Sequence, residues 1–221
     1  MYVNLVPTSV FLDASNWAVR SFVPVREIKP KEGIAMVALK DLVEERKGLR
    51  KNPEYSTAST FLGLEDVEPN LGLVLPNRSL EGRSVKTGSK TYRQRDILFG
   101  RLRPALNKVL FVDETIPEGS CSTEFIVLSP KNNQVNPEYI AIVLRLKEIN
   151  ERVSSMIRGA SLPRVAVGDL LEITIPVPSK EVQEQICKIV RSRQREYVKC
   201  VQRTGELFDE TSSSISDLLL D

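Results

Sequence analysis

The sequence predicts an α+β protein, with a bent, mostly antiparallel sheet and helices, followed by a long C-terminal α-helix. Two observations favour this class. Short β-branched and aromatic runs, separated by proline and glycine, fill the middle of the chain, as is usual in antiparallel sheets. From Lys180 onward the chain contains no proline and carries apolar residues at helical spacing. The pattern therefore divides into a folded body and a helical tail.

The body is expected to begin with a strand that leads into a short helix, over the sequence IAMVALKDLV that starts at Ile34. Residues 1–33 precede it and are interpreted as an N-terminal extension, because prolines interrupt its two short apolar pieces. FLGLEDVE is the second strand candidate. Three consecutive antiparallel strands are then expected over DILFGRL, KVLFVDE and STEFIVLSP.

A helix is predicted after these strands, over EYIAIVLRLKEINERVSSMI. Asn136 is suited to its N-cap, Pro137 to its first position, and Gly159 to its end. The strand LLEITIPVP then completes the body. We therefore divide the chain into an extension at 1–33, a body at 34–178 and a helical segment at 179–221.

The helical segment carries an apolar stripe. A heptad frame with alternating steps of four and three runs along it, and most of its seam positions are apolar. A helix of this length spans roughly 60 Å at about 1.5 Å per residue, which is longer than a compact body needs. Projection and self-association are therefore expected, although packing on its own domain is the alternative. The predicted dimer contacts are Ile186, Val190, Tyr197, Val201, Phe208 and Ile215.

Positive charge is concentrated between Arg78 and Lys108. Nine basic and two acidic residues give this window a charge of +7, whereas the whole chain is only +2. Glycines and hydroxyl side chains lie between the cations, which is typical of loops that donate hydrogen bonds to phosphates. A segregated cationic surface of this kind indicates a polyanionic partner, and nucleic acid is the commonest. The alternative is a solvated charged surface that binds nothing.

Composition limits the chemistry that the chain can perform. With 41% hydrophobic and 27% charged residues and no long apolar run, it is expected to be a cytoplasmic protein without a membrane partner. Its three cysteines form no C-x-x-C pair, so neither a disulfide framework nor a zinc or other metal site is expected. Histidine is absent, which excludes Ser-His-Asp and Cys-His catalysis and favours a binding role.

Several short motifs resemble catalytic ones. Asn-Pro-Glu-Tyr occurs at Asn52 and again at Asn136, and is similar to the Asn-Pro-Pro-Tyr loop of adenine methyltransferases, but the second proline is missing. Asp96, Asp113 and Glu124 are conceivable nuclease carboxylates, but they lack a lysine at matching spacing. No Walker loop is present. We therefore expect no catalytic residue in this chain.

The serial order of FLGLEDVE, GRSVKT, RDILFGRLRPALNKV, GSCSTEFIVLSP, NPEYIAIVLR, GASLPRV and LLEITIPVPSKEVQEQI resembles the specificity subunits of type I restriction–modification enzymes. The resemblance implies a target recognition domain that reads one half of a bipartite DNA site, followed by a helical spacer. Complete members hold two such domains and two antiparallel spacers. This chain has one of each, so it is either a fragment or a half-subunit that rebuilds the two-domain form by homodimerisation.

The resemblance also implies the partners. S-adenosylmethionine, Mg and ATP would belong to methyltransferase and restriction subunits, and this chain itself would bind none of these cofactors. Two other hypotheses remain open, a recognition domain cut from a single-chain type II restriction or methyltransferase enzyme, and a protein-interaction module that does not bind DNA.

The candidate DNA contacts fall into two groups. Three cations on or beside strands are expected to neutralise phosphates, and those on loops are expected to reach base edges. The phosphate contacts are Arg101, Arg103 and Lys108. The loop residues are Arg46, Arg50, Lys51, Tyr55, Arg83, Lys86, Lys90 and Arg93, to which Arg164 is added as a further contact.

Overall fold

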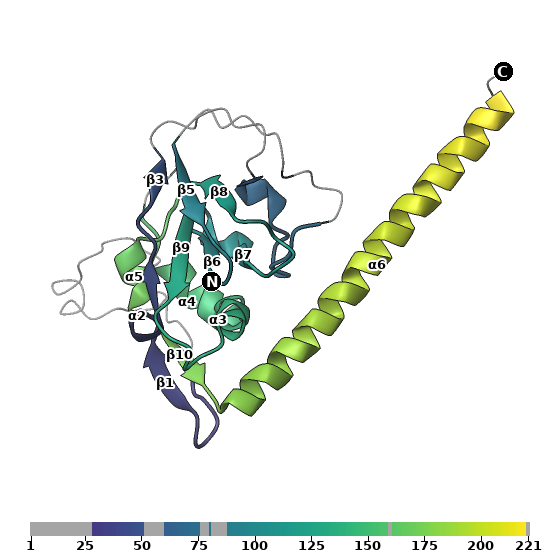
Figure 1. Cartoon of the computed structure of the whole chain (residues 1–221). Helices are drawn as coiled ribbons and strands as arrows, with labels where there is room; N and C mark the ends of the chain where they lie inside the picture. The colour runs from purple at the N-terminus through teal and green to yellow at the C-terminus, as the bar shows by residue number, and fades with distance from the viewer. Residues whose placement is uncertain (1–27, 51–59, 76–79, 81–87, 159–160, 220–221) are drawn as a thin grey trace, which may run out of the picture.

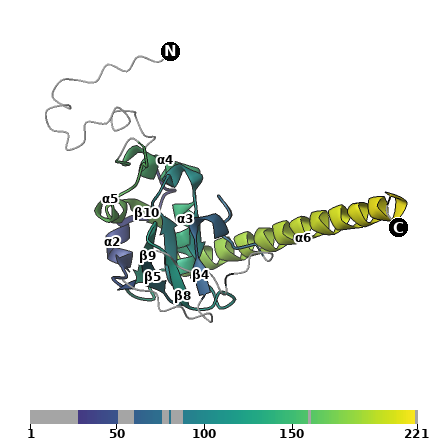
Figure 2. The ribbon, with the colours of Figure 1, turned by 90° about the horizontal axis from the view of Figure 1, so that it is seen from above.

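A computed structural model describes residues 28–50, 60–75, 80, 88–158 and 161–219. Figure 1 and Figure 2 show a body of strands and short helices from which one long helix extends. Residues 28–34, which include the end of the expected N-terminal extension, form a turn and irregular chain before the first strand. Residues 1–27 lie outside the described part, so their role stays a prediction.

Three small sheets build the body, and nearly all their strand pairs are antiparallel, as predicted. The exception is the parallel pair of β4 and β8. The two-stranded sheet joins β1 (Ala35–Ala38) to β10 (Thr174–Val177). The first four-stranded sheet has the order β2 (Val43–Glu45), β9 (Phe125–Pro130), β6 (Ile97–Gly100) and β7 (Val109–Phe111). The second has the order β3 (Leu49–Arg50), β5 (Ser89–Tyr92), β8 (Gly119–Ser122) and β4 (Thr60–Leu62).

Residues 43–50 give the sheet its bend, because they pass from one four-stranded sheet to the other. The Arg46 amide donates to the Val127 carbonyl at 2.9 Å in the first sheet. Two residues later the Gly48 carbonyl accepts from the Thr91 amide at 3.2 Å in the second. One continuous stretch of backbone thus connects the two sheets.

Strand β6 lies at the centre of the body and is buried on both faces. Ile97 and Phe99 belong to one core cluster, whereas Leu98 belongs to the other. A strand covered on both faces is apolar at successive positions, without polar alternation. This explains the run ILFG. Both β7 and β9 pair antiparallel with β6, which lies between them in the sheet.

The short helices cover the larger core cluster. They are α2 (Leu39–Leu42), α3 (Pro137–Leu144), α4 (Lys147–Ser155) and α5 (Val167–Leu171). Asn136 caps α3 as predicted, because its side chain accepts from the Glu138 amide at 2.9 Å.

The single helix expected before Gly159 is divided into α3 and α4. Arg145 lies at the break, where its side chain donates to the Val109 carbonyl at 3.1 Å. Its own carbonyl accepts from the Asn107 side chain at 2.8 Å. These tertiary contacts redirect the chain despite its helical pattern, so that the prediction of one helix was wrong.

The C-terminal helix α6 (Lys180–Leu219) is unbroken over 40 residues. This corresponds to roughly 60 Å. Its first turns are fixed to the body, since Arg191 makes a two-pronged ion pair with Glu138 and the Gln194 amide donates to the Leu71 carbonyl at 2.6 Å. From Lys199 onward every described residue of α6 except Val201 is exposed, and Figure 1 shows this part projecting away from the body. In the described part of the chain, no helix has the length and apolarity that a membrane crossing requires.

Candidate nucleic-acid interface

Strands β5, β6, β8 and β9 define two opposite ends of the body. The register pairs Tyr92 with Gly119 near one end, where the turn 93–96 connects β5 to β6. It pairs Ser89 with Ser122, and Gly100 with Phe125, at the other. We call the first the Asp96 end and the second the Glu124 end, after the acidic residue in each.

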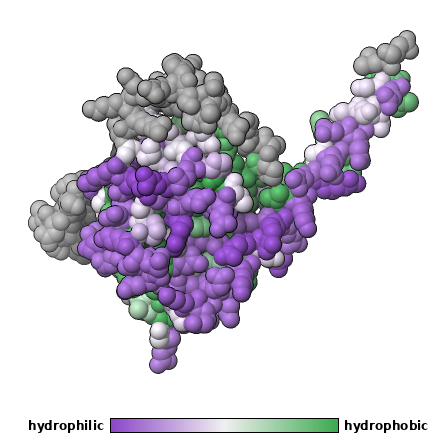
Figure 3. Space-filling view, viewed as in Figure 1, coloured by the Kyte–Doolittle hydropathy of each residue, from purple (hydrophilic) through white to green (hydrophobic). Residues whose placement is uncertain are grey.

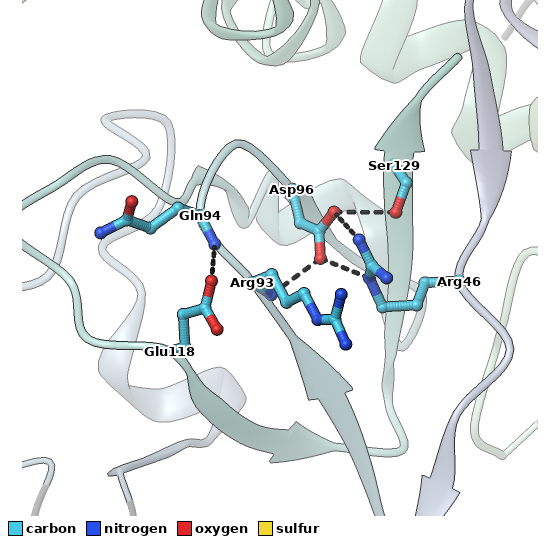
Figure 4. Close-up of polar contacts among 6 residues, drawn as sticks. All are labelled: Arg46, Arg93, Gln94, Asp96, Glu118 and Ser129. Atoms are coloured by element: carbon cyan, nitrogen blue, oxygen red, sulfur yellow. Dashed lines mark hydrogen bonds and ion pairs between the residues drawn. The ribbon is translucent and has the colours of Figure 1, made fainter.

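The Asp96 end is a buried polar network (Figure 4). The Asp96 carboxylate is only 1% exposed, and it accepts from Arg46 Nε at 2.7 Å and Nη2 at 3.0 Å. It also accepts from the Ser129 hydroxyl and the Arg93 amide, each at 2.8 Å. Hydrogen bonding to Asp96 comes first among the causes that raise the pKa of Arg46. Arg46 was predicted to reach a base edge, and in the structure its partly exposed guanidinium is bound to Asp96.

The Glu124 end gathers three of the predicted DNA contacts. The Glu124 carboxylate accepts from Arg164 Nε at 2.9 Å and from Nη2 at 2.5 Å. This hydrogen bonding lowers the pKa of Glu124, and the positive charges of Arg164, Arg101 and Lys90 add to the effect. Lys90 also pairs with Glu45 at 3.2 Å. We call Lys90, Arg101, Glu124 and Arg164 the Glu124 cluster.

Arg101 has an unsatisfied donor within this cluster. Its Nε atom is buried, yet it has no hydrogen-bond partner among the described residues. The backbone of Arg101 is fixed on both sides, because its amide donates to the Glu124 carbonyl at 2.9 Å and its carbonyl accepts from the Val165 amide at 3.1 Å. The guanidinium is therefore attached to a rigid strand end while its buried nitrogen remains without an acceptor.

The remaining described cations differ in their availability. Lys108 Nζ donates to the Leu64 carbonyl at 2.7 Å, so its charge is used to join two parts of the body. Arg103 is exposed in a left-handed conformation, with φ of 48°. Arg93 is also exposed, but it lies at the Asp96 end, away from Arg101. The described cations of the basic window are thus divided between the two ends of the body.

One further predicted base reader, Arg50, lies at the Glu124 end, because it ends β3 and its backbone pairs with Ser89. Four predicted base readers lie outside the described residues, in segments that follow Arg50 or precede Ser89 in the sequence. They are Lys51, Tyr55, Arg83 and Lys86.

The three carboxylates considered for nuclease chemistry do not meet. Asp96 is engaged by Arg46 at one end, and Glu124 by Arg164 at the other. Asp113 accepts from the amide and hydroxyl of Thr115, which closes a local turn. Within the described ranges, no group of three or more acidic or cysteine side chains is arranged to hold a metal ion.

The predicted dimer stripe on α6 is divided by the body. Ile186 and Val190 pack against the larger core cluster, so they belong to the attachment of the helix. Tyr197 and Val201 are half-buried, whereas Phe208 is 72% and Ile215 51% exposed. Hydrophobic residues interrupt the polar surface toward the far end of α6 in Figure 3. The free apolar stripe thus begins near Tyr197.

Sequence reasoning did not identify the role of Glu124. It was considered only as a nuclease carboxylate, whereas the structure makes it the acceptor for an arginine forty positions away in the chain. A single sequence contains no local signal for such a pair, because the two residues meet only when the segment around Arg164 crosses the β8–β9 turn. Leu102 forms the isolated bridge with Arg164 that fixes this crossing.

The chain is similar to known proteins both in sequence and in fold. The chain is 30% identical over 129 residues to the HindI specificity subunit of a type I restriction enzyme from Haemophilus influenzae, over 55% of this chain and 28% of that one. Its fold is similar to the HsdS subunit from Thermoanaerobacter tengcongensis, with a TM-score of 0.62, 23% identity, and coverage of 85% of this chain and 48% of that one.

A type I restriction–modification S subunit from M. genitalium has a TM-score of 0.57 and 17% identity, over 90% of this chain and 50% of that one. The chain thus spans about half the length of these two structures. The sequence profile of the type I restriction modification DNA specificity domain matches residues 32–197, which is most of the body together with the attached turns of α6. The chain belongs to the type I restriction modification DNA specificity domain family.

Proposed function

We propose that this chain recognises one half of a bipartite double-stranded DNA site and directs a type I restriction–modification complex to it. The observation that carries the proposal is the Glu124 cluster, in which the Arg101 amide donates to the Glu124 carbonyl and the Arg164 side chain pairs with the Glu124 carboxylate, so that two arginines lie at one strand end. Arginine side chains are suited to charge-assisted hydrogen bonds with phosphate oxygens. Membership of the DNA specificity domain family supports the same ligand.

The proposed interface is the Glu124 end of the body. Arg50 and Arg101 belong to strand ends there, so their backbones are held by the sheets. Arg103 follows Arg101 and is exposed. Such contacts to phosphates set the position of a protein on the duplex, whereas base edges specify the sequence. We assign base reading to the segments that contain Lys51, Tyr55, Arg83 and Lys86.

The chemistry of modification and cleavage is proposed to lie in other subunits. Methyltransferase subunits would supply the S-adenosylmethionine site, and a restriction subunit would use Mg and ATP. This chain would contribute sequence recognition and no catalytic group, in the cytoplasm where the DNA lies. The dispersed positions of Asp96, Asp113 and Glu124, each engaged by a neighbour, support this division.

Helix α6 is proposed to pair with α6 of a second copy. Phe208, Leu218 and Leu219 are more than two thirds exposed, which is unusual for large apolar residues that share one helix. Since the chain covers only about half of the HsdS structures, a second copy would supply an equivalent second body. The paired helices would then set the distance between two half-sites.

A binding experiment with the full chain tests the function. A duplex pool of random sequence is selected for binding, and affinity is measured for a selected and a shuffled duplex at several salt concentrations. We expect a preference for the selected duplex. Replacing both Arg101 and Arg103 with alanine should weaken binding and make the slope of log K against log salt shallower by about 1.8, which is about 0.9 per phosphate contact.

Two controls separate this function from a module that binds only protein. The double variant Lys188→Ala and Lys199→Ala removes two exposed cations from α6 and should leave DNA affinity nearly unchanged. Self-association should persist in the Arg101 and Arg103 variant, because α6 is intact. If the wild-type chain selects no consensus and shows no salt dependence, the DNA-binding function is wrong.

A further inference from the structure

Glu124 controls the orientation of Arg164. An arginine guanidinium has five N–H donors in a rigid planar fork. The Glu124 carboxylate accepts hydrogen bonds from the Nε and Nη2 atoms of Arg164, which form one edge of the guanidinium. Nη1 lies 3.4 Å from the Leu162 carbonyl, which is too long for a strong hydrogen bond. The ion pair therefore fixes the plane of the guanidinium and leaves its outer edge, formed by Nη1 and the second hydrogen of Nη2, without a strong partner among the described residues.

The Arg164 and Glu124 side chains both reach the surface of the body. The Arg164 side chain is 35% exposed and the Glu124 side chain 25%, so the pair is at the surface but is not fully solvated. Partial burial strengthens charge-assisted hydrogen bonds relative to those in water. The site is thus better suited to binding an anion than an isolated surface arginine would be.

The charge of the cluster matches one phosphate group. Lys90 pairs with Glu45, and Arg164 pairs with Glu124. Arg101 is the remaining cation, and its buried Nε has no acceptor in the described part of the chain. The cluster together with Glu45 therefore carries one net positive charge.

We propose that Glu124 is a positioning residue for DNA binding, which holds Arg164 so that its outer edge and Arg101 bind the same backbone phosphate. Glu124 itself does not touch the DNA. The inference rests on the proposed function, since it assigns a phosphate contact within that interface. It also adds a role for an acidic residue, which simple charge attraction to DNA would not suggest.

The replacement Glu124→Gln tests the inference through the sign of its effect. Removing a negative charge near DNA should strengthen binding if charge alone decides. If Glu124 positions Arg164, the amide group presents a donor to one of the two arginine nitrogens and the fixed fork is lost. We expect the dissociation constant for the selected duplex to rise by about tenfold, which is the effect of losing one hydrogen bond to a charged group.

A matched control is available at the opposite end of the body. Glu118 is exposed and accepts from the Gln94 amide at 3.3 Å. The replacement Glu118→Gln makes the same chemical change at the Asp96 end, and should leave DNA affinity unchanged or slightly increased. A loss of affinity that is confined to Glu124→Gln is therefore a property of the cluster and not of net charge.

Two variants of Arg164 complete the experiment. Arg164→Ala should weaken binding and reduce the salt slope by about 0.9, for one lost phosphate contact. The double variant with Glu124→Gln and Arg164→Ala should bind DNA as tightly as Arg164→Ala alone, because both changes remove the same contact. Arg164→Lys keeps the charge without the fork, and should lose affinity while the salt slope is retained. Circular dichroism of each variant shows whether it is folded at the temperature of the measurement.

The outcomes distinguish this inference from the function itself. If Glu124→Gln binds as tightly as Glu118→Gln, or if the losses from Glu124→Gln and Arg164→Ala add, Glu124 does not position Arg164. In that case the wild-type chain would still prefer the selected duplex, and the function would stand. If the wild-type chain itself selects no consensus, the function fails before the cluster is tested.

Discussion

At the scale of single residues, the cations of this chain fall into structural and available sets. A cation is structural when its side chain bonds to a residue that is distant in the sequence, and available when it does not. Arg46 serves the buried Asp96, and Lys108 serves the Leu64 carbonyl. Arg101 and Arg103 have no side-chain hydrogen bond to other described residues. A count of basic residues along the sequence therefore overestimates the surface that a polyanion can use.

Asp96 is expected to be essential for stability. It is 1% exposed and accepts hydrogen bonds from Arg46, Ser129 and the Arg93 amide. Replacing it with alanine leaves a partly buried guanidinium without its counter-ion, so that the free energy of unfolding should fall by about 3 kcal/mol or more. Urea denaturation measures this change.

The control for this prediction is Asp113→Ala, in an exposed turn at the same end of the body. Its carboxylate bonds only to Thr115, two residues away, so the free energy of unfolding should change by less than about 1 kcal/mol. Equal losses in the two variants would contradict a special role for the Asp96 network.

The three cysteines are expected to differ in reactivity. Cys121 and Cys187 are buried, and burial raises the pKa of each thiol to about 12. Since the thiolate is the nucleophile, neither should react with iodoacetamide near pH 8, whereas the exposed Cys200 should. Mass spectrometry of peptides from the alkylated chain gives the site, and alkylation in urea, where all three should react, is the control. Labelling of Cys121 in the folded chain would show that its strand opens.

The site could be predicted from the sequence only in part. The concentration of cations between Arg78 and Lys108 is visible in the sequence, and it led to the prediction of Arg101 and Arg103 as phosphate contacts. Which end of the body each cation lies at depends on how β5 pairs with β8, and no local sequence pattern determines this pairing. The same holds for Glu124, because its partner is brought to it by a segment forty residues away.

At the scale of elements, the apolar strands were predicted and the polar ones were missed. The runs around β6, β7 and β9 have β-branched and aromatic residues, and each forms a strand. By contrast, β5 has the sequence SKTY and β8 has GSCS, short polar runs without a stretch of apolar residues. These two strands pair along their full lengths, so that tertiary pairing decides their conformation.

Two glycines are expected to respond oppositely to alanine. Gly205 lies in the projecting part of α6, and a Cβ there would meet nothing within 4 Å. Glycine is unfavourable in a helix by about 1 kcal/mol relative to alanine. Gly205→Ala should therefore increase the hydrogen-exchange protection of the amides near it by up to about fivefold.

Gly72 is the opposite case, because its φ is 62° and a Cβ would collide with the Val109 carbonyl and the Arg145 side chain. Gly72→Ala should lower the free energy of unfolding by about 1 kcal/mol or more, as measured in urea. If Gly72→Ala leaves the free energy of unfolding unchanged, the segment around Gly72 can move away from Arg145 and Val109 without destabilising the protein.

At the scale of the whole molecule, the structure is a folded body joined to a long helix. The junction is not a flexible linker, because Gln183 is 2% exposed and its side chain accepts from the Asn136 amide at 2.9 Å. The ion pair between Arg191 and Glu138 adds a second attachment about two turns further along α6. These two attachments fix the direction of α6 relative to the body, as the proposed spacing of two half-sites would require.

The free stripe of α6 gives the test of this arrangement. Phe208 lies in the middle of the exposed stripe that starts near Tyr197, and it is 72% exposed in the single chain. If a second copy covers it, Phe208→Asp places an unpaired charge in the helix pair and should convert the dimer to a monomer. Sedimentation velocity of the full chain measures the change in mass.

Ser213→Asp is the matched control, because it adds the same charge to the same part of α6. Residue 213 lies about half a turn away from Thr211 and Ile215, on the face opposite the stripe, since successive residues are about 100° apart. It should leave the dimer intact. The bodies themselves are unchanged in both variants, so Phe208→Asp should retain binding to a single half-site and lose the added affinity for two half-sites at fixed spacing. If both variants sediment like the wild-type chain, the stripe is not the contact between copies, and the spacing of half-sites must be set by another surface.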